Sequence, residues 1–70
     1  MKNRIREFRV ARNWTQDRLA RKAKVHYSTI SLLESGKRNP SPLVMGKLAR
    51  ALQVPEDVLF PNGEPLEEVS

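Results

Sequence analysis

The 70-residue sequence contains no cysteine, and this absence excludes several kinds of chemistry at once. A chain without thiols has no disulfide, no thiolate zinc site and no cysteine nucleophile, so packing alone must stabilise its fold. Because this composition suits a reducing compartment, we expect a cytoplasmic protein. The single histidine, His26, has no ligand partners, so the sequence predicts neither a metal site nor a general base.

Long apolar segments are missing as well, and no run approaches the roughly 20 residues that cross a bilayer. The charged start of the chain, residues 1–6, is not followed by an apolar stretch, so we expect no secretory signal and no membrane segment. The length leaves room for one small core, since typical domains need roughly 100 to 200 residues. We therefore expect one domain over residues 1–60 and a short, acidic, flexible tail over residues 61–70.

Basic residues are absent from the last part of the chain. The first 50 residues hold all 13 Lys and Arg and only three acids, a balance of +10, whereas residues 51–70 hold five acids and no base, a balance of −5. A basic body of this kind attracts a polyanion such as a nucleic acid, and the acidic end is repelled from it. Solvated charge that serves solubility alone is the other interpretation, and charge by itself leaves both open.

Apolar residues recur at helical spacing, and no strand-like alternation is present, so the sequence predicts an all-α fold with five short helices. The first three predicted helices cover about residues 2–12, 16–23 and 27–35, the fourth begins at Pro42, and Pro55 opens a short fifth. Capping signals separate them: Asn13 and Gly36 suit left-handed ends, and Thr15 and Ser41 suit N-caps. The predicted inward-facing residues are Ile5, Phe8, Ala11, Leu19, Ala20, Ala23, Ile30, Leu33, Met45, Leu48, Ala49 and Leu52.

The segment from Thr15 to Gly36 is the most informative part of the chain. Two short helices joined by a tight turn, with small Ala20 where they cross, form a predicted helix-turn-helix at about residues 16–35. In such a pair the first helix lies across the phosphate backbone, and the second presents its outer face to the major groove of DNA. The segment therefore favours DNA as the polyanion that the basic part of the chain binds.

The outer face of the predicted second helix of this pair is short-chained and uncharged, which suits hydroxyl hydrogen bonds and contact with a thymine methyl. The expected base contacts are Tyr27, Ser28, Ser31 and Leu32. Tyr27 has a second interpretation, in which it fills space beside Val25, and Trp14 is more typical of core packing than of stacking on a sugar. Residues at helix ends and in the basic loop are expected to contact phosphates: Thr15, His26, Lys37, Arg38 and Asn39.

Four motifs resemble the lambda repressor and Cro family of helix-turn-helix regulators over about residues 3–60. They are I-R-E-F-R, W-T-Q-D-R-L-A, S-T-I-S-L-L-E-S-G-K-R-N-P and L-A-R-A-L-Q-V. The resemblance implies a compact five-helix domain that binds operator DNA, usually as a two-fold dimer. It also implies that Gln16 contacts a phosphate and that Arg9 and Glu34 form an ion pair in the interior.

The chain departs from the family pattern at three turn positions. Lys24 stands where the family usually has a turn glycine, and a left-handed lysine costs roughly 1 to 2 kcal/mol. His26 stands where serine or threonine usually caps the next helix, and Gln53 replaces a glycine after the fourth helix. We expect none of these changes to abolish the motif, and we expect the first two, Lys24 and His26, to affect the pose of the recognition helix, the second helix of the motif.

A domain this small cannot cover a full operator, so we expect a homodimer on an inverted repeat, with Val58, Leu59 and Phe60 as dimer contacts unless they cap the core instead. The sequence favours a repressor-type transcription regulator acting on cytoplasmic, nucleoid DNA, with no catalytic residues and no cofactor. The alternative is a protein-interaction adaptor on the same fold, with only non-specific DNA affinity and a partner protein recognised through the acidic tail.

Overall fold

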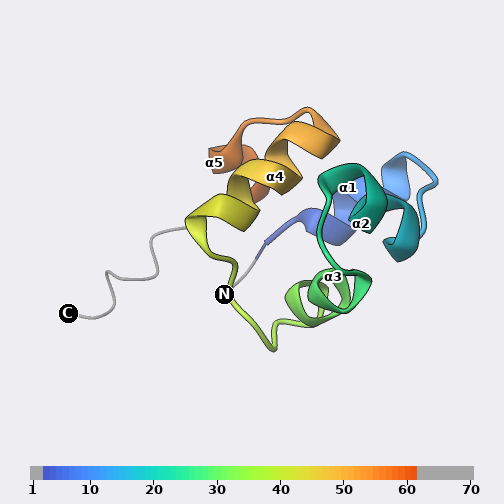
Figure 1. The fold of residues 1–70 in the computed structure, drawn as a ribbon. Helices are drawn as coiled ribbons and strands as arrows, with labels where there is room; N and C mark the ends of the chain where they lie inside the picture. The colour runs from blue at the N-terminus through green and yellow to red at the C-terminus, as the bar shows by residue number, and fades with distance from the viewer. Residues whose placement is uncertain (1–2, 62–70) are drawn as a thin grey trace.

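Residues 3–61 are described in a computed structural model and form five helices without a strand, so the all-α prediction is confirmed (Figure 1). The helices are α1 (Ile5–Ala11), α2 (Gln16–Ala23), α3 (Tyr27–Glu34), α4 (Pro42–Leu52) and α5 (Glu56–Leu59). None of these helices combines the length and the apolar character that crossing a membrane requires. The expected acidic tail lies outside the described residues, apart from Pro61.

Side-chain caps begin the helices where the sequence places them. Thr15 Oγ1 accepts a hydrogen bond from the Arg18 amide at 3.0 Å and starts α2. Ser41 Oγ accepts from the Val44 amide at 3.3 Å and starts α4, whose first residue is Pro42. A proline at this position loses nothing, because the first amides of a helix have no intrahelical partner.

Helix α1 begins later than the predicted residue 2, and Asn3 provides the physical reason. Its Oδ1 accepts from the Ile5 amide at 3.1 Å, and its Nδ2 donates to the Leu33 carbonyl at 3.1 Å. These two bonds hold the chain before α1 in a non-helical path beside the end of α3. At the other end, Asn13 adopts a φ of 61°, which confirms the left-handed residue expected after this helix.

The core is built from aliphatic side chains of all five helices. Seven of them are almost fully buried: Ile5, Leu19, Ile30, Leu33, Leu48, Leu52 and Leu59. Helix α2 packs against both α3 and α4, and α1 packs against the same two helices, so α3 is held from two sides. The small residues Ala20 and Ala23 are buried in α2, which allows its neighbours to approach closely.

The prediction that Ala11 faces inward is wrong, because this residue is exposed. At 3.6 residues per turn, Ala11 lies about 120° around the helix from Ile5, which is beyond the buried stripe. Met45 and Phe8 are half-buried and pack at the margin of the core. The remaining predicted inward residues are buried.

The end of the described chain closes the core. Leu59 is 0% exposed and Phe60 is 3% exposed, and the Leu59 carbonyl accepts a hydrogen bond from the Arg4 amide at 2.9 Å. These two side chains therefore cap their own core, which corrects the expectation that they contact a second copy of the chain. Val58 is half-buried and is the one member of that expected trio with a substantial exposed surface.

Candidate nucleic-acid interface

A three-residue connection sets the angle between α2 and α3. Lys24 adopts the left-handed conformation with φ 60° and ψ 47°, so it occupies the backbone position for which a glycine is better suited. The Val25 amide donates to the Ala20 carbonyl at 3.0 Å, which closes the end of α2. The connection is thus a tight turn with a left-handed residue, although a lysine in this conformation is less favourable than a glycine.

His26 begins α3 as an unusual N-cap. Its backbone is extended, and Nδ1 accepts a hydrogen bond from the Ser28 amide at 3.1 Å. The same nitrogen lies 2.7 Å from Ser28 Oγ, and the imidazole stacks on the Tyr27 ring with centroids 5.4 Å apart. Imidazole nitrogen here replaces the hydroxyl oxygen of a serine or threonine cap, so the first turn of α3 is held in place despite the departure from the family pattern.

Three of the four expected base-contact residues form an exposed face of α3. Tyr27 is 56% exposed, Leu32 is 36% exposed and Ser28 is exposed as well. Ser31 is half-buried and lies at the edge of a small hollow that it shares with residues of α1 and α2. The exposed face therefore presents one aromatic ring, one hydroxyl and one aliphatic side chain within the first two turns of the helix.

An ion pair anchors the carboxyl-terminal end of α3. Arg9 Nε donates to Glu34 Oε2 at 2.7 Å and Nη2 donates to Oε1 at 3.1 Å, and the two side chains are 12% and 5% exposed. The third guanidinium bond runs from Nη1 to the Trp14 carbonyl at 2.6 Å. This fork ties α1, the connection before α2, and the end of α3 together, and such bidentate pairs are the geometrically specific ones.

Gln16, the expected phosphate contact at the start of α2, lies beside this pair. Its Nε2 donates to Glu34 Oε1 at 3.1 Å, so one amide proton is already engaged. The side chain is half-buried, and its position is fixed by the carboxylate. Glu34 therefore orients two residues, one from α1 and one from α2.

The remaining expected phosphate contacts are exposed and lie next to the two helices. Thr15 precedes α2, and Lys37, Arg38 and Asn39 form the loop that follows α3, drawn in yellow-green in Figure 1. Gly36 starts this loop with a φ of 78°, which a side chain would strain. Two cations, Lys37 and Arg38, which form no salt bridge with any residue from 3 to 61, thus lie in the loop after α3.

The sequence is consistent with Arg12 as a solvated surface residue, but the structure gives it a tertiary role. Its Nη2 donates to the Leu52 carbonyl at 2.6 Å and its Nη1 donates to the Phe8 carbonyl at 3.0 Å, so it joins the ends of α1 and α4. Trp14 is half-buried against the core, and Lys22 Nζ lies 5.1 Å from the centroid of its ring. Both are structural residues: Trp14 packs as the sequence favours, whereas only tertiary contacts identify the role of Arg12.

Among residues 3–61 no group of His, Asp or Glu side chains is arranged to hold a metal ion. Every buried side-chain nitrogen and oxygen of these residues has a hydrogen-bond partner. The polar groups that remain available on this part of the chain are therefore on its surface, and the surface around α3 has the features of a binding face.

Comparison with known proteins places this geometry in a family. A helix-turn-helix family matches residues 5–59. A protein of Archaeoglobus fulgidus that is named as an uncharacterized HTH-type transcriptional regulator is 42% identical over 69 residues, which cover 97% of each chain.

Two solved structures have the same fold. The restriction-modification controller protein C.AhdI from Aeromonas hydrophila matches with a TM-score of 0.78 and 37% identity, over 81% of this chain and 86% of its own. A hypothetical transcription factor from Neisseria, NHTF, matches with a TM-score of 0.76 and 31% identity, over 94% of this chain and 75% of its own. Both resemblances extend well beyond the two helices of the motif.

Proposed function

We propose, because this chain belongs to the Cro/C1-type helix-turn-helix family of transcriptional regulators, that it is a sequence-specific, repressor-type regulator of double-stranded DNA. In this proposal residues 1–60 are the DNA-binding domain, and they act on DNA of the cytoplasmic nucleoid. Helix α3 enters the major groove, as the second helix of such a motif does.

The observation that carries the proposal is the contrast between the two sides of α3. Leu33 is buried on the inner side and the pair between Arg9 and Glu34 holds the carboxyl-terminal end of the helix, whereas Tyr27 and Ser28 are exposed on the outer side. A recognition helix needs a rigid attachment to the rest of the domain and exposed side chains on the side that faces the bases, because a mobile helix cannot discriminate base edges.

The chemistry of the outer side supports a particular kind of reading. Ser28 and Ser31 offer hydroxyl groups, and Leu32 offers a methyl-bearing surface that suits the thymine methyl. Arginine, which reads guanine by two hydrogen bonds, is absent from the described residues of α3. We therefore expect half-sites in which A·T pairs dominate at the positions that α3 contacts.

Phosphate contacts are assigned to residues that flank this side. They are Thr15, Gln16, His26, Lys37, Arg38 and Asn39. Backbone contacts fix the register of the protein on the duplex without reading its sequence. For Gln16 the proposal uses the amide group that Glu34 already orients.

Binding to an inverted repeat as a homodimer follows from the size of the domain. Two copies would place their α3 helices about 34 to 36 Å apart, one turn of DNA. Because Leu59 and Phe60 are buried, the dimer contact is assigned to the outer surface of α5, where Val58 is partly exposed.

Selection of bound sequences from a random duplex pool tests the proposal. We expect enrichment of a short inverted repeat with its half-sites one turn apart, and sedimentation of the complex should show two chains per duplex. Recovery of sequences without a common motif would contradict sequence-specific regulation and would favour the adaptor function. One chain bound at saturation to an asymmetric site would exclude the dimer.

A further inference from the structure

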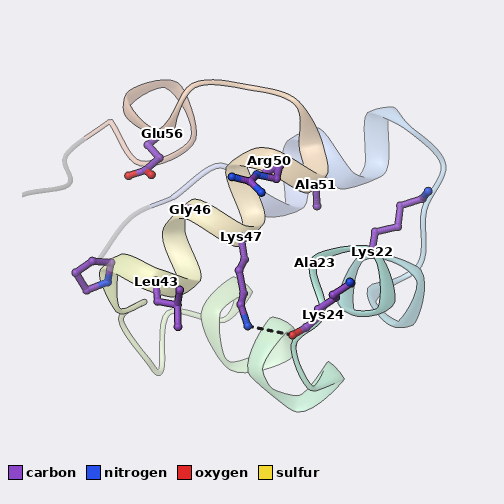
Figure 2. Close-up of a pocket in the computed structure, with 10 residues that line it drawn as sticks. Lys22, Ala23, Lys24, Leu43, Gly46, Lys47, Arg50, Ala51 and Glu56 are labelled. Atoms are coloured by element: carbon purple, nitrogen blue, oxygen red, sulfur yellow. Dashed lines mark hydrogen bonds between the residues drawn. The ribbon is translucent and has the colours of Figure 1, made fainter.

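A basic cleft lies between α2 and α4, and its lining includes none of the residues assigned to DNA. Its volume is about 870 Å³, and the cations that line it include Lys24, Lys47 and Arg50 (Figure 2). Lys22 lines it as well, but its ammonium lies 5.1 Å from the centroid of the Trp14 ring. The walls also carry apolar surface from Ala23, Leu43 and Ala51, and Leu43 is 68% exposed. Cations around an apolar floor suit a ligand that carries both carboxylates and aliphatic groups.

The cations of the cleft have no acidic partner within the described part of the chain. The salt bridges of residues 3–61 join Arg4 to Glu7, Arg9 to Glu34 and Arg21 to Asp17, and none uses a cleft cation. Lys47 Nζ instead donates to the Lys24 carbonyl at 3.4 Å, which joins the two walls. One wall of the cleft is therefore also the turn that precedes α3.

A carboxylate already lies at the rim of the cleft. Glu56 of α5 lines it, and Glu56 Oε2 lies 3.5 Å from where a Cβ on Gly46 would stand. The Phe60 amide donates to the Glu56 carbonyl at 2.8 Å, so Pro61 follows within one helical turn of this rim. The described part of the chain thus ends at Pro61, near this rim.

We propose that this cleft holds the chain's own acidic carboxyl-terminal segment, residues 62–70, which lies outside the described residues. The segment carries Glu64, Glu67 and Glu68 together with Leu66 and Val69, which matches the charge and the apolar floor of the cleft. Nine residues reach at most about 30 Å, enough to bring these carboxylates to the cations of both walls.

The covalent link between this segment and α5 makes such an interaction effective. Exposed charge pairs contribute little one at a time, so a free acidic peptide would bind weakly. A segment joined to α5 by a few residues has an effective concentration in roughly the millimolar range, which converts weak contacts into substantial occupancy. The inference does not depend on the proposed function, because it concerns the chain without DNA.

A single spin label tests the proposal directly. The chain has no cysteine, so Ser70→Cys allows one nitroxide to be attached to the segment of an otherwise unchanged, ¹⁵N-labelled protein. We expect loss of amide signal at Gly46, Lys47 and Ala23 relative to the reduced label. The signals of Arg6 and Ser35, which line a separate hollow, should be retained.

Charge dependence is the second part of the test. The signal loss should disappear in 1 M salt, where the screening length is about 3 Å, and in the labelled chain with Glu64, Glu67 and Glu68 changed to glutamine. Lys47→Gln combined with Arg50→Gln should restore the signals in the same way. The matched control is Arg21→Gln, an exposed cation of α2 that pairs with Asp17 and does not line the cleft. Circular dichroism checks that each variant is folded.

Three results would overturn the proposal. Retained cleft signals in the labelled parent would show that the segment does not enter the cleft. Signal loss that is unchanged by salt and by the glutamine substitutions would show that charge does not direct it. Signal loss on a ¹⁵N-labelled chain mixed with a separate spin-labelled chain would assign the cleft to the segment of a second copy.

Discussion

The two faces of α3 differ in how strongly the rest of the molecule constrains them. Ile30 and Leu33 on the inner face are almost fully buried, and Glu34 is held by two side chains from other helices. Tyr27 and Ser28 on the outer face are exposed, and their side chains interact with the adjacent cap residue, His26. The helix therefore separates positioning from reading, and substitutions on the two faces should affect different measurements.

The two ion pairs that involve α1 also differ in how well they are shielded from solvent. Arg9 and Glu34 are shielded, whereas Arg4 and Glu7 are 42% and 61% exposed although their Nε and Oε1 atoms are 2.9 Å apart. The hydrogen bond from Arg4 lowers the pKa of Glu7, and the same bond raises the pKa of Arg4. Solvent screening leaves an exposed pair of this kind with little effect on stability.

Glu34→Gln should have the largest effect of the changes considered, and that effect should be on stability. The substitution leaves the Arg9 guanidinium shielded without its counter-charge, which costs about 3 to 5 kcal/mol in buried pairs. We expect urea denaturation to show this loss in the free energy of unfolding. A melting temperature within a degree or two of the parent would mean that the pair contributes little to stability. The matched control is Glu7→Gln, which removes an exposed pair.

Tyr27→Ala, on the outer face, should have little effect on stability and a clear effect on DNA binding. Its ring is 56% exposed, so stability should change by less than about 0.5 kcal/mol. Loss of a base-edge contact should weaken binding to the selected operator by roughly 1 to 3 kcal/mol. Titration of a labelled duplex and a thermal melt of the free protein measure the two quantities. A large loss of stability would place Tyr27 in the structural set beside Val25.

Asn13, Thr15 and Ser41 show which parts of the fold could be predicted from the sequence. Their effects act over a few residues, through a left-handed residue or a side-chain oxygen that accepts from the next turn, and each is found where expected. Leu59 and Phe60 depend instead on contacts with distant helices, so hydrophobicity alone does not tell a core cap from a dimer surface.

The candidate site likewise contains features that could be predicted from the sequence and features that could not. Helical position identifies Tyr27, Ser28 and Leu32 as an outer face, because spacing along one helix determines which side chains share a side. The basic cleft cannot be predicted in this way, since Lys24 belongs to the turn after α2 and Lys47 to α4, and the two meet only in the folded chain. The imidazole cap of α3 cannot be predicted either, because histidine is not among the usual cap residues.

Lys24→Gly should raise the free energy of unfolding, by less than the stability change expected for Glu34→Gln and the binding change expected for Tyr27→Ala. It removes a left-handed lysine at φ 60°, and the relief exceeds the backbone entropy of glycine by about 0.5 to 1 kcal/mol. Lys24→Ala retains the Cβ and therefore the strain, which makes it the matched control. Equal unfolding free energies for the glycine and alanine variants would show that the turn is not strained at this residue.

Glu7→Gln should have the smallest effect and a particular dependence on pH. Because the pKa of Glu7 is lowered in the folded chain, the pair stabilises the fold above the ordinary carboxylate pKa and loses this effect as pH falls through the lowered value. Melts of parent and variant should therefore converge in acid, from a small difference at neutral pH. Divergence on acidification would contradict the assignment.

The central claim is that α3 reads bases while the loop after it contacts the backbone. The most direct measurement is the affinity of the parent, Ser28→Ala and Arg38→Ala for the selected operator and a scrambled duplex at two salt concentrations. We expect Ser28→Ala to lose roughly 1 to 3 kcal/mol on the operator alone. Arg38→Ala should weaken both duplexes alike and reduce the salt slope by about 1. Equal binding of both duplexes by the parent, with Ser28→Ala indistinguishable from it, would contradict the claim.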